Sequence, residues 1–163
     1  TRARTCRAAP APRPPPPRGG PPAAPLEARP PLGLLSDFET EDAPGAPGTI
    51  DLKKSGARLY VDAGRVLALA AAVLHTNTAE RLRQAGHKLG MSAEEIAAAT
   101  EGFYFIQTLR LREQLLGERA GGDPPSPNRV DPERLNEVDR RILKESFRQA
   151  GKLQSRLALD YQL

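Results

Sequence analysis

The sequence predicts an all-α protein, a helical bundle of about four principal helices behind a disordered, proline-rich N-terminal segment. Aromatic residues make up 4% of the chain and tryptophan is absent. The core must therefore be built from Leu, Ala, Ile and Val, which suits helix-on-helix packing better than a β-sandwich. Of the 17 prolines, 13 precede Thr49, and apolar residues recur at helical spacing only from Tyr60 onward. The 163 residues suffice for one domain.

Residues 1–29 form the predicted disordered segment, which is rich in proline and arginine. Four consecutive prolines at 14–17 cannot enter a helix or a sheet, so we expect polyproline II conformation there. Two interpretations stay open for this segment. It is either a ligand for a proline-recognising domain or a linker without selected structure.

Residues 30–56 differ from both neighbours in composition. Acidic side chains cluster at 37–42, and a Gly/Pro/Ala loop follows at 43–48. Residues 49–53 alternate polar and apolar, which indicates a short strand or an extended arm.

The first two helices follow from apolar spacing and from capping residues. Asp62 is a plausible N-cap for a first helix that starts near Tyr60 and runs to Leu74. Its apolar residues cover most of its surface, which predicts a central, buried helix. Residues 76–78 break it and cap a second helix, which Gly90 ends as a left-handed residue.

The last two helices have clear start signals. Ser92 and Glu95 form a capping box for a long helix over residues 93–118. A Gly/Pro loop over residues 117–129 follows. Pro132, directly after Asp131, suits the first turn of a final helix that continues to near Leu157.

Charge and cysteine content exclude several classes of protein. The net charge is +4 and the pI about 9.6, but basic and acidic residues are interleaved in every segment, so we do not expect nucleic-acid binding. Cys6 is the single cysteine, which excludes a disulfide or a cysteine-based zinc site within the chain and favours a cytoplasmic protein. The longest apolar run, Val66 to Leu74, is too short to span a bilayer.

Motifs for chemistry within the chain are sparse. The sequence contains no P-loop, nucleophile elbow or dinucleotide fingerprint, and His75 and His87 lack ligands at metal-binding spacing. The acids at 37–42 lie in a loop-rich stretch rather than on a rigid strand, which disfavours a metal-binding carboxylate pair. Arg110 and Gln114 share a helix face. That face either holds a phosphate or is solvated and paired with neighbouring glutamates.

Seven strings, in order, resemble one family's sequence. They are RPPLG at 29–33, TIDLKKSG at 49–56, VDAGRVLAL at 61–69, TAERL at 78–82, LRLREQ at 109–114, VDP at 130–132 and LKESFR at 143–148. The family is the nucleotidyltransferase substrate-binding domain. It is the helical C-terminal partner of a uridylyltransferase-like catalytic domain, in bacterial signalling proteins that often carry CBS and cyclic-nucleotide-binding domains.

The resemblance implies a division of the chain. Residues 1–29 would be the disordered segment, 30–56 the remnant of the end of a catalytic domain, and 57–163 the helical substrate-binding domain. The Gly-Ser motif and aspartate pair of the catalytic half are missing, so whether the chain is itself an enzyme stays open. Residues 30–54 could pack on the bundle without the sheet of a catalytic domain, and five of their apolar side chains would then be exposed or poorly placed. They are Leu32, Leu35, Phe38, Ile50 and Leu52.

The resemblance also implies a function. The chain would be an accessory domain, non-catalytic on its own, that holds a nucleotide or an acceptor against a catalytic nucleotidyltransferase domain. Its candidate substrate-binding residues are Asp51, Lys53, Arg65, Arg110 and Gln114. The basic side chains would contact phosphates and Asp51 would orient Lys53. We expect no cofactor in this chain, and Mg²⁺ with a nucleoside triphosphate only in the complete enzyme. The alternative is a helical protein–protein interaction or homodimerisation module without nucleotide binding.

Overall fold

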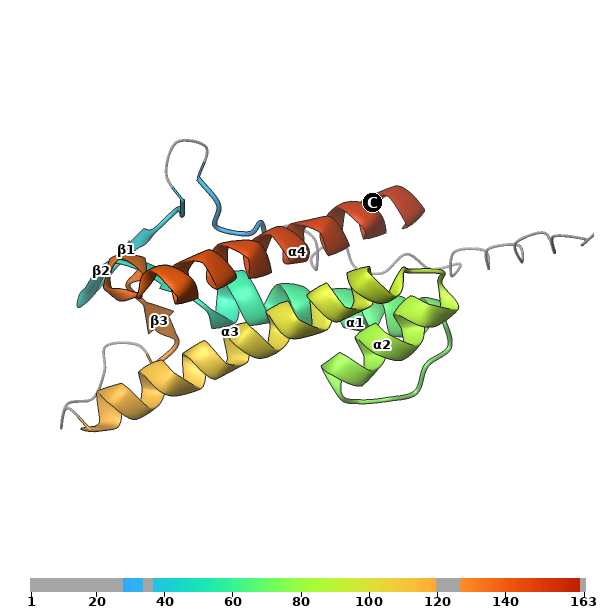
Figure 1. Cartoon of the computed structure of the whole chain (residues 1–163), viewed down its shortest axis with the longest axis horizontal. Coiled ribbons are helices and arrows are strands. Elements are labelled where there is room, and N and C mark those ends of the chain that lie inside the picture. Colours follow the sequence, from blue (N-terminus) through green and yellow to red (C-terminus); the bar gives the residue numbers. More distant parts are fainter. Residues whose placement is uncertain (1–27, 34–36, 120–126, 162–163) are drawn as a thin grey trace, which may run out of the picture.

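The computed structural model describes residues 28–33, 37–119 and 127–161, and within them the protein is a four-helix bundle with a small sheet at one end. Figure 1 shows the two longest helices, α3 (Ala93–Arg119) and α4 (Glu137–Tyr161), side by side along the long axis. The predicted all-α class is confirmed. The proline-rich segment, Leu35 and most of the predicted Gly/Pro loop lie outside the described residues.

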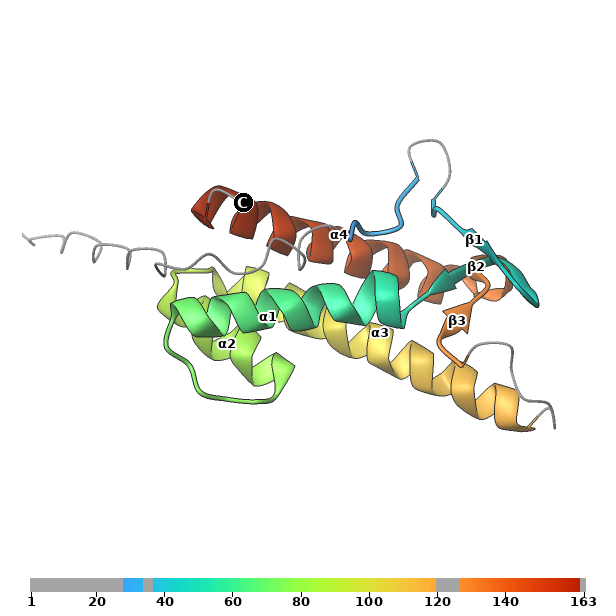
Figure 2. The same cartoon turned by 180° about the vertical axis from the view of Figure 1, so that it is seen from behind.

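The two shorter helices complete the bundle. Helix α1 (Arg58–Ala70) packs against α4, and α2 (Thr78–Lys88) packs against α1 and α3. Figure 2, seen from behind, shows α1 in front of the long pair. None of the helices described here combines the length and the apolar character that crossing a bilayer requires.

A three-stranded antiparallel sheet with the strand order β1-β2-β3 lies at one end of the bundle. Its strands are β1 (Glu41–Ala43), β2 (Ala46–Asp51) and β3 (Arg129–Val130). Strand β2 confirms the predicted extended stretch, although it starts three residues earlier. Strand β3 was expected to be loop. It has only two residues and exists because Ile50 pairs with Val130 across 80 residues of sequence, which a local pattern does not reveal.

The predicted start of the first helix was wrong. A π-helical turn, η2 (Lys53–Ala57), leads directly into α1, so Asp62 lies inside the helix and pairs with Arg58 and Arg65 instead of capping. Asp51 fills the capping role, because its Oδ1 accepts hydrogen bonds from the backbone N–H groups of Lys53 and Lys54.

The predicted end of that helix was also wrong. Helix α1 ends at Ala70, and Leu69 and Leu74 are 77% and 96% exposed rather than buried. Ala72 adopts a positive φ of 50°, and the N–H of Val73 donates to the carbonyl of Ala68. This is a Schellman ending with alanine where glycine is usual, so the sequence carries no glycine to mark it.

The boundaries of α2 and the start of α3 confirm the predictions, whereas α4 begins at Glu137, five residues after the predicted Pro132, with Asn136 as its cap. Asn77 accepts a hydrogen bond from the N–H of Glu80 and caps α2, and Gly90 has a φ of 72° just beyond its end. Ser92 and Glu95 form the reciprocal capping box of α3. A 3-10 turn, η3 (Pro132–Arg134), precedes α4, with Pro132 buried in its first turn.

The core is aliphatic, with a few aromatic anchors. Tyr60 is fully buried, and its hydroxyl donates to the carbonyl of Ser146 on α4. Burial raises the pKa of Tyr60, so the hydroxyl stays protonated as a donor. Gly102 on α3 lies so close that a Cβ there would overlap the Tyr60 oxygen. The three residues therefore fix how α1, α3 and α4 meet.

Four of the five apolar side chains singled out in segment 30–56 lie within the described residues, and none of these four is exposed. Ile50 and Leu52 are 1% and 0% exposed, Phe38 is buried, and Leu32 is half-buried. Phe38 packs edge-on against Phe147 of α4, with ring centroids 6.1 Å apart. The bundle itself covers these side chains, which therefore need no further sheet. The division of the chain between residues 56 and 57 stays a prediction, and it falls inside the continuous run of η2 and α1.

Candidate functional site

Four of the five sequence-predicted site residues lie towards the sheet end of the domain. Asp51 ends β2, Lys53 begins η2, and Arg110 and Gln114 lie one turn apart on α3. Asn128 connects the end of β2 with helix α3. Its backbone carbonyl accepts from the N–H of Leu52 at 2.9 Å, and its side-chain oxygen accepts from Arg110 Nη2 at 2.7 Å.

Arg65 is separated from the other four. It lies on α1 twelve residues beyond Lys53, about 18 Å along the helical run. Its exposed guanidinium pairs with Asp62 on the same helix, 3.5 Å away. The structure therefore does not bring the five residues into one group.

Asp51 and Arg110, two of the five predicted residues, already have structural partners. Asp51 caps η2, and Arg110 binds the side-chain oxygens of Asn128 and Gln107. None of the five lines either of the two cavities described next. Their assignment as substrate ligands stays a prediction.

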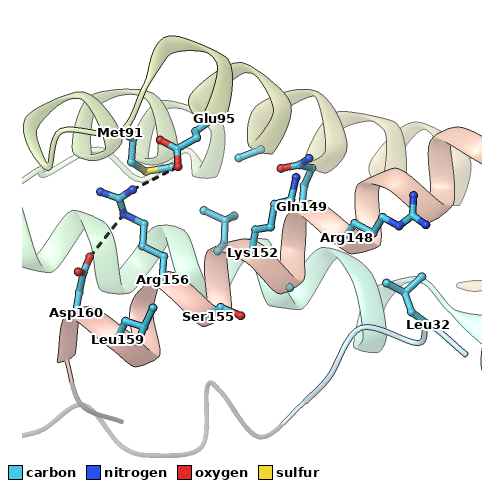
Figure 3. Close-up of a pocket in the computed structure, with 13 residues that line it drawn as sticks. Leu32, Met91, Glu95, Arg148, Gln149, Lys152, Ser155, Arg156, Leu159 and Asp160 are labelled. Atoms are coloured by element: carbon cyan, nitrogen blue, oxygen red, sulfur yellow. Dashed lines mark hydrogen bonds and ion pairs between the residues drawn. The ribbon is translucent and has the colours of Figure 1, made fainter. Parts of the chain in front are cut away.

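A pocket of about 700 Å³ lies between α4, the start of α3 and the segment that carries Leu32 (Figure 3). Its apolar surface comes from Leu32, Met91, Ala99 and Leu153, of which the last three are buried. Both the volume and the apolar lining are typical of a small-molecule site. We call it the α4 pocket.

Basic side chains line the α4 pocket at intervals of four residues along α4. Arg148, Lys152 and Arg156 therefore share one face of the helix. Arg156 is already engaged, because its guanidinium lies 3.5 Å from Glu95 and 3.6 Å from Asp160, as Figure 3 shows. The two carboxylates offset its charge, and the pair with Glu95 joins α4 to the start of α3.

The other two cations at the rim are open to a ligand. Arg148 is exposed and makes one 3.5 Å ion pair, to Glu145 one turn earlier on α4. Lys152 is exposed, and within the described ranges no carboxylate pairs with it. Ser155 adds a hydroxyl to the same rim. Two cations beside an apolar surface suit a ligand that carries phosphate at one end and an apolar ring at the other.

The chain reaches the bundle beside this pocket. Gln154 of α4 donates a 2.6 Å hydrogen bond to the carbonyl of Ala28, and Pro30 lies against Gly151. Leu32 then forms part of the pocket wall. Chain that precedes residue 28 is therefore attached next to the α4 pocket.

A second cavity, of about 750 Å³, lies at the sheet end. Two of its three arginines are already bound to carboxylates: Arg112 to Asp139 at 2.7 Å, and Arg129 to Glu41 at 2.8 Å. Its cations are thus less available than Arg148 and Lys152. The α4 pocket is the better candidate.

Sequence reasoning did not select the basic residues of the α4 pocket. Arg148 ends the last of the resembling strings, and Lys152 and Arg156 follow it at helical spacing. The four-residue interval was the available signal. What it could not show was which side of α4 faces a cavity rather than open solvent, since that depends on α3 and on the segment around Leu32.

The family model described as "Putative nucleotidyltransferase substrate binding domain" matches residues 23–161. The chain belongs to this family. The matched residues include all three elements around the α4 pocket, which are the Leu32 segment, the start of α3 and α4. Comparison with curated proteins and with solved structures gives no significant match.

Proposed function

We propose that this nucleotidyltransferase substrate-binding domain is an accessory, non-catalytic domain that presents a nucleotide to a catalytic nucleotidyltransferase domain. The observation that carries the proposal is the α4 pocket, with two available cations at its rim and an apolar surface beside them. Arg148 and Lys152 would bind the phosphates, and Leu32, Met91 and Leu153 would cover the base.

The position of the pocket supports a catalytic partner on the same side. Residues 28–32 run along α4, so a domain that precedes them in the chain would be tethered next to the pocket. Short tethering raises the effective concentration of one domain at the other. Mg²⁺ would come with the nucleoside triphosphate in the complete enzyme, whose catalytic carboxylates would hold it.

Family resemblance extends the proposal to the cellular setting. The complete protein would be cytoplasmic and would transfer a nucleotidyl group in signalling, next to CBS and cyclic-nucleotide-binding domains. The acceptor would be a protein or a small molecule.

Calorimetric titration with the four common nucleoside triphosphates, in the presence of Mg²⁺, tests the site. We expect binding by the unaltered chain and an affinity at least about tenfold lower in Arg148→Ala/Lys152→Ala, because charge-assisted hydrogen bonds contribute about 1.5–3 kcal/mol. Inorganic triphosphate, used in parallel, separates phosphate recognition from base recognition.

A charge-matched control distinguishes the pocket from the overall field. Lys54→Ala/Arg141→Ala also removes two positive charges, at exposed positions outside the α4 pocket. This variant should keep the original affinity. No heat at millimolar nucleotide, or equal losses in the two double variants, would sink the proposed site.

A further inference from the structure

Helix α3 carries apolar side chains on two opposite faces. The inner face contributes Ala99, Phe103, Ile106 and Leu109 to the core. On the outer face, Tyr104, Leu111 and Leu115 are 46%, 57% and 47% exposed. A helix with one buried face is normally polar on the other, so this outer face is matched to a partner.

The exposed residues form a continuous line, which we call the outer stripe. It consists of Ala97, Tyr104, Thr108, Leu111 and Leu115. Successive intervals of seven, four, three and four residues keep all five on one side of an α-helix. At about 1.5 Å per residue the stripe is about 27 Å long.

We propose that the outer stripe is the interface with a second copy of this chain, with the two α3 helices antiparallel about a twofold axis near residue 106. Such an interface must be complementary to itself. About residue 106, Ala97 lies opposite Leu115 of the second copy, nine residues away on each side. Thr108 lies opposite Tyr104, two residues away on each side. Leu115 and Tyr104 thus face small side chains, and Leu111 lies opposite Glu101 of the second copy, five residues away on each side.

The charges favour the same arrangement. Glu101 and Arg112 lie beside the stripe, five and six residues from residue 106 on opposite sides, and both are exposed, although Arg112 also binds Asp139 of its own chain through Nη1 at 2.7 Å. Antiparallel pairing brings Glu101 of one copy next to Arg112 of the other at both ends. In parallel pairing the same flank of the two copies would lie on opposite sides of the seam, so Glu101 and Arg112 could not meet. Flanking charges of this kind set helix orientation.

The place where the chain joins the bundle argues against a preceding catalytic domain as the occupant. Residues 28–33 lie along α4, and Figures 1 and 2 both show this segment on the far side of α4 from α3. The chain that precedes residue 28 therefore joins the bundle beside the α4 pocket, on the other side of α4 from the outer stripe. The inference of a dimer does not rest on the proposed nucleotide binding.

Sedimentation of the full chain over a wide concentration range tests the inference. We expect a reversible dimer with twice the 17.6 kDa chain mass. Leu111→Glu should raise the dissociation constant at least about tenfold, since a charge would be buried in the seam. Glu101→Lys should also weaken the dimer, by placing a lysine next to Arg112 of the other copy.

Leu74→Glu is the matched control, because Leu74 is 96% exposed and lies outside the stripe. It should leave the dimer unchanged. Circular dichroism checks that each variant is folded. If Leu111→Glu does not fold, Glu101→Lys still tests the interface. A monomer at millimolar concentration would overturn the inference. So would a dimer that both stripe variants leave intact, which would show that another face associates.

Discussion

The contact of Gly102 with Tyr60 shows how one missing side chain positions three helices. The Tyr60 hydroxyl reaches the carbonyl of Ser146 only because Gly102 leaves room beside it. Glycine in a helix normally lowers stability by about 0.5–1 kcal/mol relative to alanine. Here the close approach of α1 and α3 outweighs that loss.

Gly102→Ala should therefore destabilise the protein despite its better helix propensity. The added methyl group forces Tyr60 away from Ser146, and we expect a loss of about 1–3 kcal/mol in unfolding free energy. Urea denaturation measures it. Gly151→Ala is the control, because a Cβ there meets only Pro30 at an ordinary 3.5 Å. It should be neutral or stabilising.

A double-mutant cycle with Tyr60→Phe identifies the cause. Removing the hydroxyl removes the atom that the new methyl group would overlap. Gly102→Ala should then cost less in the Tyr60→Phe background than in the unaltered chain. Equal losses in both backgrounds would show that the crowding lies elsewhere.

At the scale of elements, Arg110 fastens the sheet to α3. Its guanidinium donates to Asn128 through Nε at 3.1 Å and through Nη2 at 2.7 Å. Asn128 directly precedes β3, and its carbonyl binds the N–H of Leu52 just beyond β2. One arginine on a helix thereby holds two strands that are far apart in the sequence.

Arg110→Ala should reduce the unfolding free energy by about 1–2 kcal/mol, because Asn128 loses a charged hydrogen-bond donor. Arg110→Lys should give a similar loss, since lysine cannot reproduce the two-pronged contact. Chemical denaturation measures both, and hydrogen exchange at Leu52 and Val130 reports on the strands. Gln114→Ala, for which the structure shows no hydrogen bond in the part it describes, should change stability by less than about 0.5 kcal/mol.

The same variants decide between two roles for Arg110. If nucleotide affinity is unchanged while stability falls, its role is structural. A stable Arg110→Ala protein with weakened nucleotide binding would instead support the sequence-based assignment of Arg110 as a phosphate ligand.

At the scale of the whole molecule, an ion-pair group joins the segment before the sheet to α4. Asp37 binds Lys144, and Arg140 lies between Asp37 and Glu133, at 3.3 and 3.0 Å. The hydrogen bond from Lys144 is the main cause that holds the pKa of Asp37 below its ordinary 3.8, with Arg140 adding to it. The group keeps Phe38 against Phe147.

The lowered pKa fixes the direction of a pH effect. A carboxyl group whose pKa is lower in the folded protein stabilises it above the unfolded pKa, and this contribution is lost as pH falls through the folded value. Asp37→Asn should therefore be less stable than the unaltered chain at pH 7, and the difference should shrink as pH falls below about 3.8 and disappear below the lowered pKa of the folded protein. Chemical denaturation at several pH values measures it.

Glu39→Gln serves as the control for this effect. Glu39 is exposed, two residues from Asp37, and the described structure gives it no side-chain partner. Its removal should leave the pH dependence unchanged. Added salt should reduce the effect of Asp37→Asn, since the pairs are partly exposed. A difference that persists at low pH would mean that the substitution acts through packing instead.

The sequence by itself determined the helical class and the boundaries of α2 and α3, whereas α4 starts five residues after the predicted Pro132. Asn77, Gly90 and the Ser92–Glu95 box act through hydrogen bonds or backbone angles within a few residues, so their effect is legible locally. The seven strings that resemble the family likewise indicated it. The start and end of α1 escaped prediction, because Asp51 caps the π-helical turn that leads into α1 and Ala72 takes a conformation expected of glycine.

Only the tertiary structure decided where the candidate functional surfaces lie. Asp37 meets Lys144 across 107 residues and Arg129 meets Thr49 across 80, so the burial of the segment around Phe38 depends on contacts that no local pattern contains. The periodicity of α4 placed Arg148, Lys152 and Arg156 on one face, but only the packing of α3 and Leu32 made that face a pocket. For α3 the sequence already contained the apolar surfaces. Its two apolar faces were both in the sequence, and packing decided which one the bundle covers.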